Sequence, residues 1–145
     1  MKILFVCTGN TCRSPMAEAL LRHKAPSLEI KSAGVFATEG APASEQAQKV
    51  LDRKGVDLAH QSKQLDDSLI EWADLILTMT LAHKQLILQQ YPGIAHKLYT
   101  LVEYADGEEA VDDIADPFGG DVSVYEQTAE ELDNYLEKLL KKLPK

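Results

Sequence analysis

Short apolar runs alternate along the chain with longer segments in which apolar residues recur at helical spacing. Four runs are predicted to form strands: 2–6, 28–32, 75–79 and 97–101. Five segments are predicted to form helices: 14–21, 43–54, 66–73, 81–90 and the closing segment, in which Leu132, Leu136, Leu139, Leu140 and Leu143 recur at helical spacing. Strands that alternate with helices indicate an α/β fold, a parallel sheet of about four strands with helices on both faces. Residues 103–122 carry neither pattern and are predicted to form a long loop.

The composition adds limits to this fold. The chain has 145 residues, of which 45% are hydrophobic and 26% charged, so we expect a single domain over residues 1–145. No apolar run approaches the roughly 18 residues of a membrane span, and the first strand lacks the basic start and the length of a signal peptide. Two cysteines cannot form a disulfide framework. We therefore expect a cytoplasmic protein with no membrane partner, and the net charge of −8 argues against a nucleic-acid partner.

Residues 7–14, Cys-Thr-Gly-Asn-Thr-Cys-Arg-Ser, connect the first strand to the first helix. Ser14 is placed to cap that helix, and Pro15 suits its first turn. Backbone N–H groups in such a loop converge on an anion, and Gly9 and Asn10 tolerate the backbone dihedrals that a close approach needs. The segment therefore predicts a phosphate-binding loop between the first strand and the first helix.

A thiol and a guanidinium lie at the two ends of this loop. A helix N-terminus and a neighbouring Arg lower a cysteine pKa, so Cys7 is predicted to be a thiolate at neutral pH and a nucleophile. The planar guanidinium of Arg13 can bind two phosphate oxygens at once. The hydroxyl of Ser14 can donate a hydrogen bond to the Cys7 sulfur.

At this point the chain resembles the low-molecular-weight protein tyrosine phosphatase family. The residues that carry the resemblance occur in family order: the loop from Cys7 to Glu18, Ser32-Ala33-Gly34, Gly55-Val56-Asp57-Leu58, His60-Gln61-Ser62, Asp74 to Met79, and Asp116-Pro117-Phe118-Gly119-Gly120. The resemblance covers nearly the whole chain and implies one phosphatase domain. The residues expected to bind phosphate are Thr8, Gly9, Asn10, Thr11, Cys12, Arg13 and Ser14.

A thiolate that attacks phosphorus expels a poor leaving group, which therefore needs a proton. Asp116 is the candidate acid, both because its Asp-Pro turn can place a carboxyl over the site and because the family has its acid in this motif. The resemblance implies a phosphocysteine intermediate, which a water activated by Asp116 would hydrolyse. No cofactor is expected, and no metal, because the four histidines show no ligand-like spacing.

Thr11 is the residue most informative about the substrate. Tyrosine phosphatases of the family usually carry Ile at this position, whereas the protein-arginine-phosphatase branch carries Thr. A hydroxyl is poorly suited to pack an aromatic ring but can orient a guanidinium. Phe118 is expected to line the entrance of the pocket. We therefore predict a phosphatase that hydrolyses phosphoarginine in proteins. The alternative is a tyrosine phosphatase, in which Thr11 would simply have the same shape as the usual Ile.

Three further interpretations depend on the same resemblance. Cys7 and Cys12 are predicted to be a redox pair, with Cys12 as a plain apolar residue under the loop as the alternative. An arsenate reductase is disfavoured because no cysteine follows Cys12, and a noncatalytic phosphate-binding module because Arg13 and Asp116 serve turnover. The expected partners are phosphorylated protein substrates, and kinship implies an opposing protein arginine kinase.

Overall fold

The computed structural model describes residues 1–107 and 112–144. A sheet of four parallel strands lies at its centre, in the order β2-β1-β3-β4. The strands are β1 (Lys2–Cys7), β2 (Glu29–Gly34), β3 (Leu75–Thr78) and β4 (Leu98–Thr100). The predicted parallel sheet is thus confirmed, with strand ends that differ from the sequence ranges by one or two residues.

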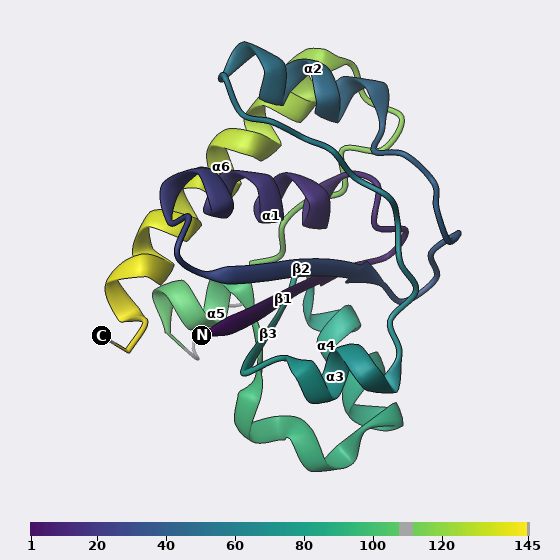
Figure 1. Cartoon of the computed structure of the whole chain (residues 1–145), viewed down its shortest axis with the longest axis vertical. Helices are drawn as coiled ribbons and strands as arrows, with labels where there is room; N and C mark the ends of the chain where they lie inside the picture. The colour runs from purple at the N-terminus through teal and green to yellow at the C-terminus, as the bar shows by residue number, and fades with distance from the viewer. Residues whose placement is uncertain (108–111, 145) are drawn as a thin grey trace.

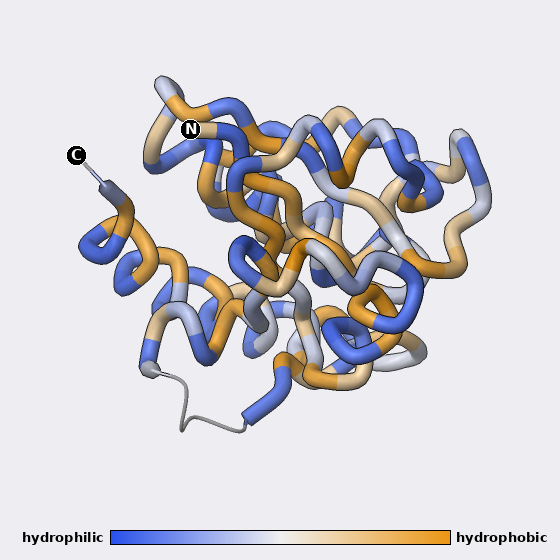
Figure 2. Tube along the Cα trace, turned by 90° about the horizontal axis from the view of Figure 1, so that it is seen from below, coloured by the Kyte–Doolittle hydropathy of each residue, from blue (hydrophilic) through white to orange (hydrophobic). Residues whose placement is uncertain are grey.

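Helices cover both faces of the sheet (Figure 1). On one side lie α1 (Arg13–Lys24), α2 (Glu45–Arg53) and α6 (Val122–Lys142), and on the other α3 (Asp67–Trp72), α4 (Leu81–Gln90) and the 3-10 helix η1 (Pro92–Lys97). Successive residues of β1 pack into opposite cores, Ile3 and Phe5 into one and Leu4 and Val6 into the other. This is why the strand is apolar throughout. Figure 2 shows hydrophobic segments gathered in the middle of the molecule, and hydrophobic and hydrophilic segments alternating along α6, which leads to the C-terminus.

The strand order places the loop after β1 at the carboxyl edge of the sheet, where ligands of such sheets bind. The chain runs from β1 to β2 on one side and then crosses to β3 on the other, so the order reverses beside β1. Ligands of open parallel sheets bind at the carboxyl ends of the strands, at such a reversal. The segment before Asp116 reaches the same edge, because Ile114 N donates to Met79 O, just beyond β3, at 2.9 Å.

Two local predictions were wrong. The predicted loop 103–122 begins inside helix α5 (Leu101–Asp106), and residues 108–111 of it lie outside the described residues. The missed signal is a capping box: the side chain of Thr100 accepts from Glu103 N, and the side chain of Glu103 accepts from Thr100 N. Ser14 does not cap α1, since the cap position is Cys12 and no side chain bonds there. The Ser14 hydroxyl points to the phosphate loop instead.

Candidate active site

Asn10 holds the phosphate loop in shape from beneath. Its φ of 58° lies in the left-handed region, which Asn tolerates better than most residues. Its amide nitrogen donates to Ser14 Oγ at 2.8 Å and to Ser32 Oγ at 2.9 Å, and its amide oxygen accepts from Lys63 N at 2.9 Å. Ser62 Oγ donates to Asn10 O at 2.7 Å. Asn10 is fully buried, so these bonds fix the loop before any ligand arrives.

The thiol of Cys7 lies inside this loop and is 3% exposed. Its sulfur is 2.8 Å from Ser14 Oγ. Because Ser14 Oγ already accepts a hydrogen bond from Asn10, its own hydrogen is free to point at the sulfur. Burial raises the pKa of the Cys7 thiol, and the Ser14 hydrogen bonds and the Arg13 charge oppose that rise. The sequence argument counted these favourable groups and omitted desolvation, which acts on the pKa in the opposite direction.

Ser14→Ala tests which group stabilises the thiolate. The variant loses the hydroxyl that faces the sulfur, so we expect a further rise of the Cys7 pKa and a kcat about 10- to 100-fold lower, the usual effect of a hydrogen bond to a charged group. The pKa is measured from the pH dependence of alkylation by iodoacetamide. Ser14→Thr keeps the hydroxyl and is the matched control. An unchanged alkylation profile in Ser14→Ala would contradict the assignment.

Arg13 connects the loop to the segment that carries Asp116. Its guanidinium is 5% exposed and donates through Nη1 to Ile114 O at 2.9 Å. Nη2 lies 3.7 Å from Asp116 Oδ2. The Asp116 side chain is about half exposed, and its Oδ1 accepts from Phe118 N at 3.0 Å. The buried cation and the exposed carboxylate therefore face the same space from two directions.

That space is a pocket of about 240 Å³ over the thiol. It is lined by Cys7, Thr8, Gly9, Thr11, Cys12, Arg13, Asp116 and Phe118. The structure thus brings together all the residues proposed from the sequence except Asn10 and Ser14, which are fully buried and do not line the pocket. Phe118 is 78% exposed and stands at the rim of the pocket. A thiol, a guanidinium and a carboxyl around one pocket suit phosphoryl transfer.

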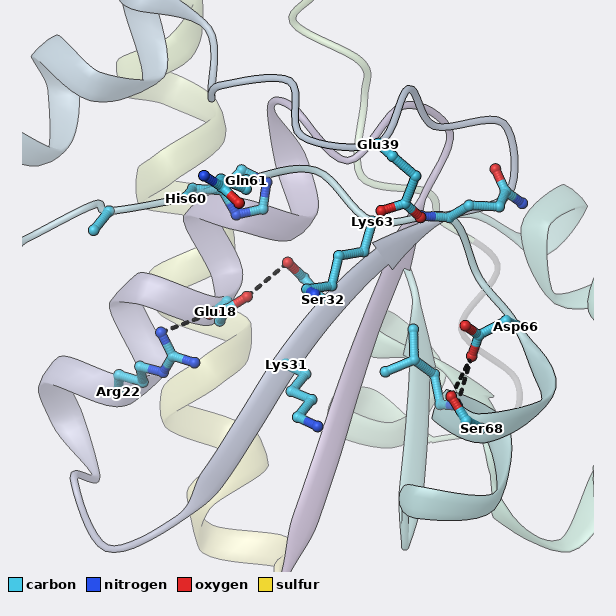
Figure 3. Close-up of a pocket in the computed structure, with 13 residues that line it drawn as sticks. Glu18, Arg22, Lys31, Ser32, Glu39, His60, Gln61, Lys63, Asp66 and Ser68 are labelled. Atoms are coloured by element: carbon cyan, nitrogen blue, oxygen red, sulfur yellow. Dashed lines mark hydrogen bonds and ion pairs between the residues drawn. The ribbon is translucent and has the colours of Figure 1, made fainter.

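A larger cleft, of about 790 Å³, lies elsewhere between α1, β2 and residues 59–69 (Figure 3). It contains no cysteine, so it is not the site of the chemistry. Two of its lining residues nevertheless bond Asn10: Ser32 accepts from the Asn10 amide, and His60 Nε2 lies 2.7 Å from Asn10 O. Ser32 also donates to Glu18 at 2.6 Å, as the dashed line in Figure 3 marks. The cleft wall therefore supports the phosphate loop.

Two residues that contact the phosphate loop, His83 and Tyr125, were not identified from the sequence. His83 Nε2 lies 2.8 Å from Thr8 Oγ1, a contact that the spacing of the histidines in the sequence does not indicate. Tyr125 is buried, and its Oη lies 3.2 Å from Cys12 Sγ. Burial and the Cys12 contact raise the pKa of Tyr125 to about 12. Cys7 and Cys12 are both free thiols in the structure, so their redox pairing stays a prediction.

Comparisons with known proteins agree with this geometry. The family model described as low molecular weight phosphotyrosine protein phosphatase matches residues 2–145. A protein-arginine-phosphatase of Geobacillus stearothermophilus is 50% identical over 143 residues, which are 98% of this chain and 95% of that protein. The low molecular weight protein-tyrosine-phosphatase PtpB of Staphylococcus epidermidis strain RP62A is 41% identical over 143 residues, 96% of each chain.

A solved structure extends the comparison to the site. It is described as the YwlE arginine phosphatase, a C7S mutant with phosphorylated active site serine, and it matches with a TM-score of 0.94 at 45% identity, over 99% of this chain and 95% of that chain. Fold and site together define a cysteine-dependent phosphatase. The chain belongs to the low molecular weight phosphotyrosine protein phosphatase family.

Proposed function

We propose that this protein is a protein arginine phosphatase, which hydrolyses phosphoarginine in proteins through a phosphocysteine intermediate. The observation that carries the proposal is the position of Thr11 in the wall of the pocket that holds Cys7. A hydroxyl there can bond the N–H groups of a guanidinium, whereas an aliphatic side chain would favour an aromatic ring. The identity of 50% to a relative named protein-arginine-phosphatase supports the same substrate.

The chemistry proceeds in two steps. The Cys7 thiolate attacks phosphorus, the P–N bond breaks, and the guanidine nitrogen leaves with a proton from Asp116. Loop N–H groups and Arg13 stabilise the charge on the phosphoryl oxygens in the transition state. The Asp116 carboxylate then takes a proton from a water, whose oxygen attacks the phosphocysteine and releases inorganic phosphate and the Cys7 thiolate. Each residue acts from its observed place in the pocket, and no cofactor enters either step.

The second candidate substrate is phosphotyrosine, and Phe118 is the residue that favours it. An exposed aromatic ring at the rim can pack against a phenyl ring. The same ring can also stack on a planar guanidinium, so it fits both substrates. The discriminating group is therefore Thr11 rather than Phe118.

Thr11→Ile tests the proposal directly. We expect the wild type to prefer matched phosphoarginine over phosphotyrosine peptides in kcat/KM, and the variant to lose that preference by at least about tenfold, because the hydroxyl in the pocket wall is gone. Thr11→Val removes the hydroxyl at nearly constant shape, and Thr11→Ser keeps it. If Thr11→Val behaves like Thr11→Ile and Thr11→Ser like the wild type, the Thr11 hydroxyl determines the preference for phosphoarginine. A wild type that prefers phosphotyrosine would overturn the arginine assignment.

The biological setting follows from the proposed substrate. Phosphorylated proteins are the substrates, and a protein arginine kinase is the enzyme that would oppose this one. No helix among residues 1–107 and 112–144 is long and apolar enough to cross a membrane. We propose a cytoplasmic location, because a reactive thiol functions best in a reducing compartment.

A further inference from the structure

His83 makes a contact with the phosphate loop that the mechanism above does not use. It is the third residue of α4 and lies at the carboxyl edge of the sheet, just after β3. Its ring is 7% exposed, and Nε2 lies 2.8 Å from Thr8 Oγ1. Thr8 follows the nucleophile directly in the sequence and lines the active-site pocket. A buried imidazole therefore bonds a hydroxyl beside the reacting thiol.

The ring of His83 is neutral at pH 7. The charged groups that face it are Arg13 from α1 and Asp113 and Asp116 from the segment before α6. Burial and the Arg13 charge lower its pKa to about 4, and the two carboxylates oppose that shift without reversing it. A place in the first turn of α4 also disfavours the cation, because the helix N-terminus is positive. A neutral imidazole carries one N–H and one acceptor nitrogen.

The other ring nitrogen settles which one carries the hydrogen. Nδ1 is buried and has no hydrogen-bond partner among the residues that the structure describes. Orphaned buried N–H groups are rare in proteins and costly, and an unpaired acceptor is the more tolerated state. The hydrogen therefore lies on Nε2, which donates to Thr8 Oγ1. The Thr8 hydroxyl, having accepted that bond, keeps its own hydrogen for another acceptor.

We propose that His83 is a positioning residue that orients the Thr8 hydroxyl as a hydrogen-bond donor to the phosphoryl group held over Cys7. The hydroxyl then adds a side-chain donor to the backbone N–H groups of the loop and to Arg13. This inference rests on the phosphoryl transfer of the proposed function and not on its arginine preference, because the donor faces the phosphoryl group, which phosphoarginine and phosphotyrosine share.

A plain structural clamp is the competing explanation. In that case the bond between His83 and Thr8 only fastens the loop to α4, and its loss lowers the melting temperature without a specific effect on the phosphoryl group. The positioning role makes a different prediction. His83 then acts through Thr8, so its replacement has no further effect on catalysis once the Thr8 hydroxyl is absent.

The experiment combines two sites and two substrates. The variants are Thr8→Val, Thr8→Ser, His83→Leu, His83→Gln and the double variant Thr8→Val with His83→Leu. Each is assayed with p-nitrophenyl phosphate and with a phosphoarginine peptide, and inorganic phosphate is titrated as a competitive inhibitor. Melting temperatures are recorded for all. The p-nitrophenyl phosphate assay keeps the test independent of the arginine preference, which the peptide pair with Thr11→Ile decides separately.

We expect Thr8→Val and His83→Leu each to lower kcat/KM by about 10- to 100-fold on both substrates, as for other hydrogen bonds to charged groups, and to weaken phosphate inhibition. The double variant should be no worse than Thr8→Val alone. Thr8→Ser and His83→Gln should restore most of the activity, since each keeps a group of the same bonding type. Additive losses in the double variant, or a Thr8→Val with unchanged kcat/KM, would overturn the proposal. Thr8 is exposed, so its variants remain informative if His83→Leu fails to fold.

Discussion

Cys7→Ser is expected to lower kcat by about 10⁴-fold or more, because removal of a nucleophile leaves only the binding contribution of a site. A serine hydroxyl ionises far less readily than a thiol, and the buried loop that stabilises a thiolate does too little to make an alkoxide. The fold should survive, since Ser differs from Cys by one atom. The bonds of Asn10 that shape the loop do not involve the sulfur.

The measurement is single-turnover kinetics with a phosphoarginine peptide, together with the melting temperature and the affinity for inorganic phosphate. The melting temperature and the affinity for inorganic phosphate should both stay close to the wild-type values. The related structure whose introduced active site serine is phosphorylated suggests a further readout. We expect Cys7→Ser to accumulate a phosphoseryl adduct, visible by mass spectrometry, which does not turn over. Retention of more than a hundredth of the wild-type kcat would remove Cys7 from the mechanism.

The sequence alone predicted the parts of the site that are formed by residues close together along the chain. Cys7 and Arg13 lie on one loop between a strand and a helix, and the rules for such loops place them around an anion. Asp116 needed the family resemblance, because an Asp-Pro turn alone does not say which edge of the sheet it reaches. The structure shows the reason: Ile114 bonds Met79 beyond β3, a long-range contact with no sequence signature.

The parts that the sequence did not reveal depend on burial. His83 bonds Thr8, a residue 75 positions earlier, and nothing in its own neighbourhood distinguishes it from an ordinary helical histidine. Desolvation of the Cys7 thiol was omitted for the same reason, since it is set by all the residues around the group. Ser14 was assigned to a cap because its position fits one, but the buried amide of Asn10 competes for its oxygen.

Asn10 also explains how distant segments support one small site. Ser62 and Lys63 both bond it, and they belong to the same stretch that lines the larger cleft through His60 and Lys63. Ser32 bonds it from β2. The loop is therefore held by β2 and by residues 60–63, which keeps its N–H groups in place without a ligand. Such preorganisation is what makes electrostatic stabilisation of a transition state effective.

Asp116→Asn is expected to lower kcat at least a hundredfold with phosphoarginine peptides. The amide keeps the shape of the side chain and can still accept from Phe118 N, but it has no proton to give to the departing guanidine nitrogen. It also cannot activate the water of the second step. With p-nitrophenyl phosphate the first step should suffer much less, because nitrophenolate leaves readily without a proton. Steady-state kcat and the burst of nitrophenolate, measured together, separate the two steps.

Asp113→Asn is the matched control for this variant. Asp113 belongs to the same segment, and its Oδ1 accepts from Leu81 N at 2.8 Å, a bond that an amide oxygen also makes. Its carboxylate does not line the pocket, so its loss should change kcat by no more than a few-fold. A slowed second step with an intact burst in Asp116→Asn would establish both roles of the carboxyl. Equal losses in the two variants would mean that the negative charge of the segment matters and that the acid is another group.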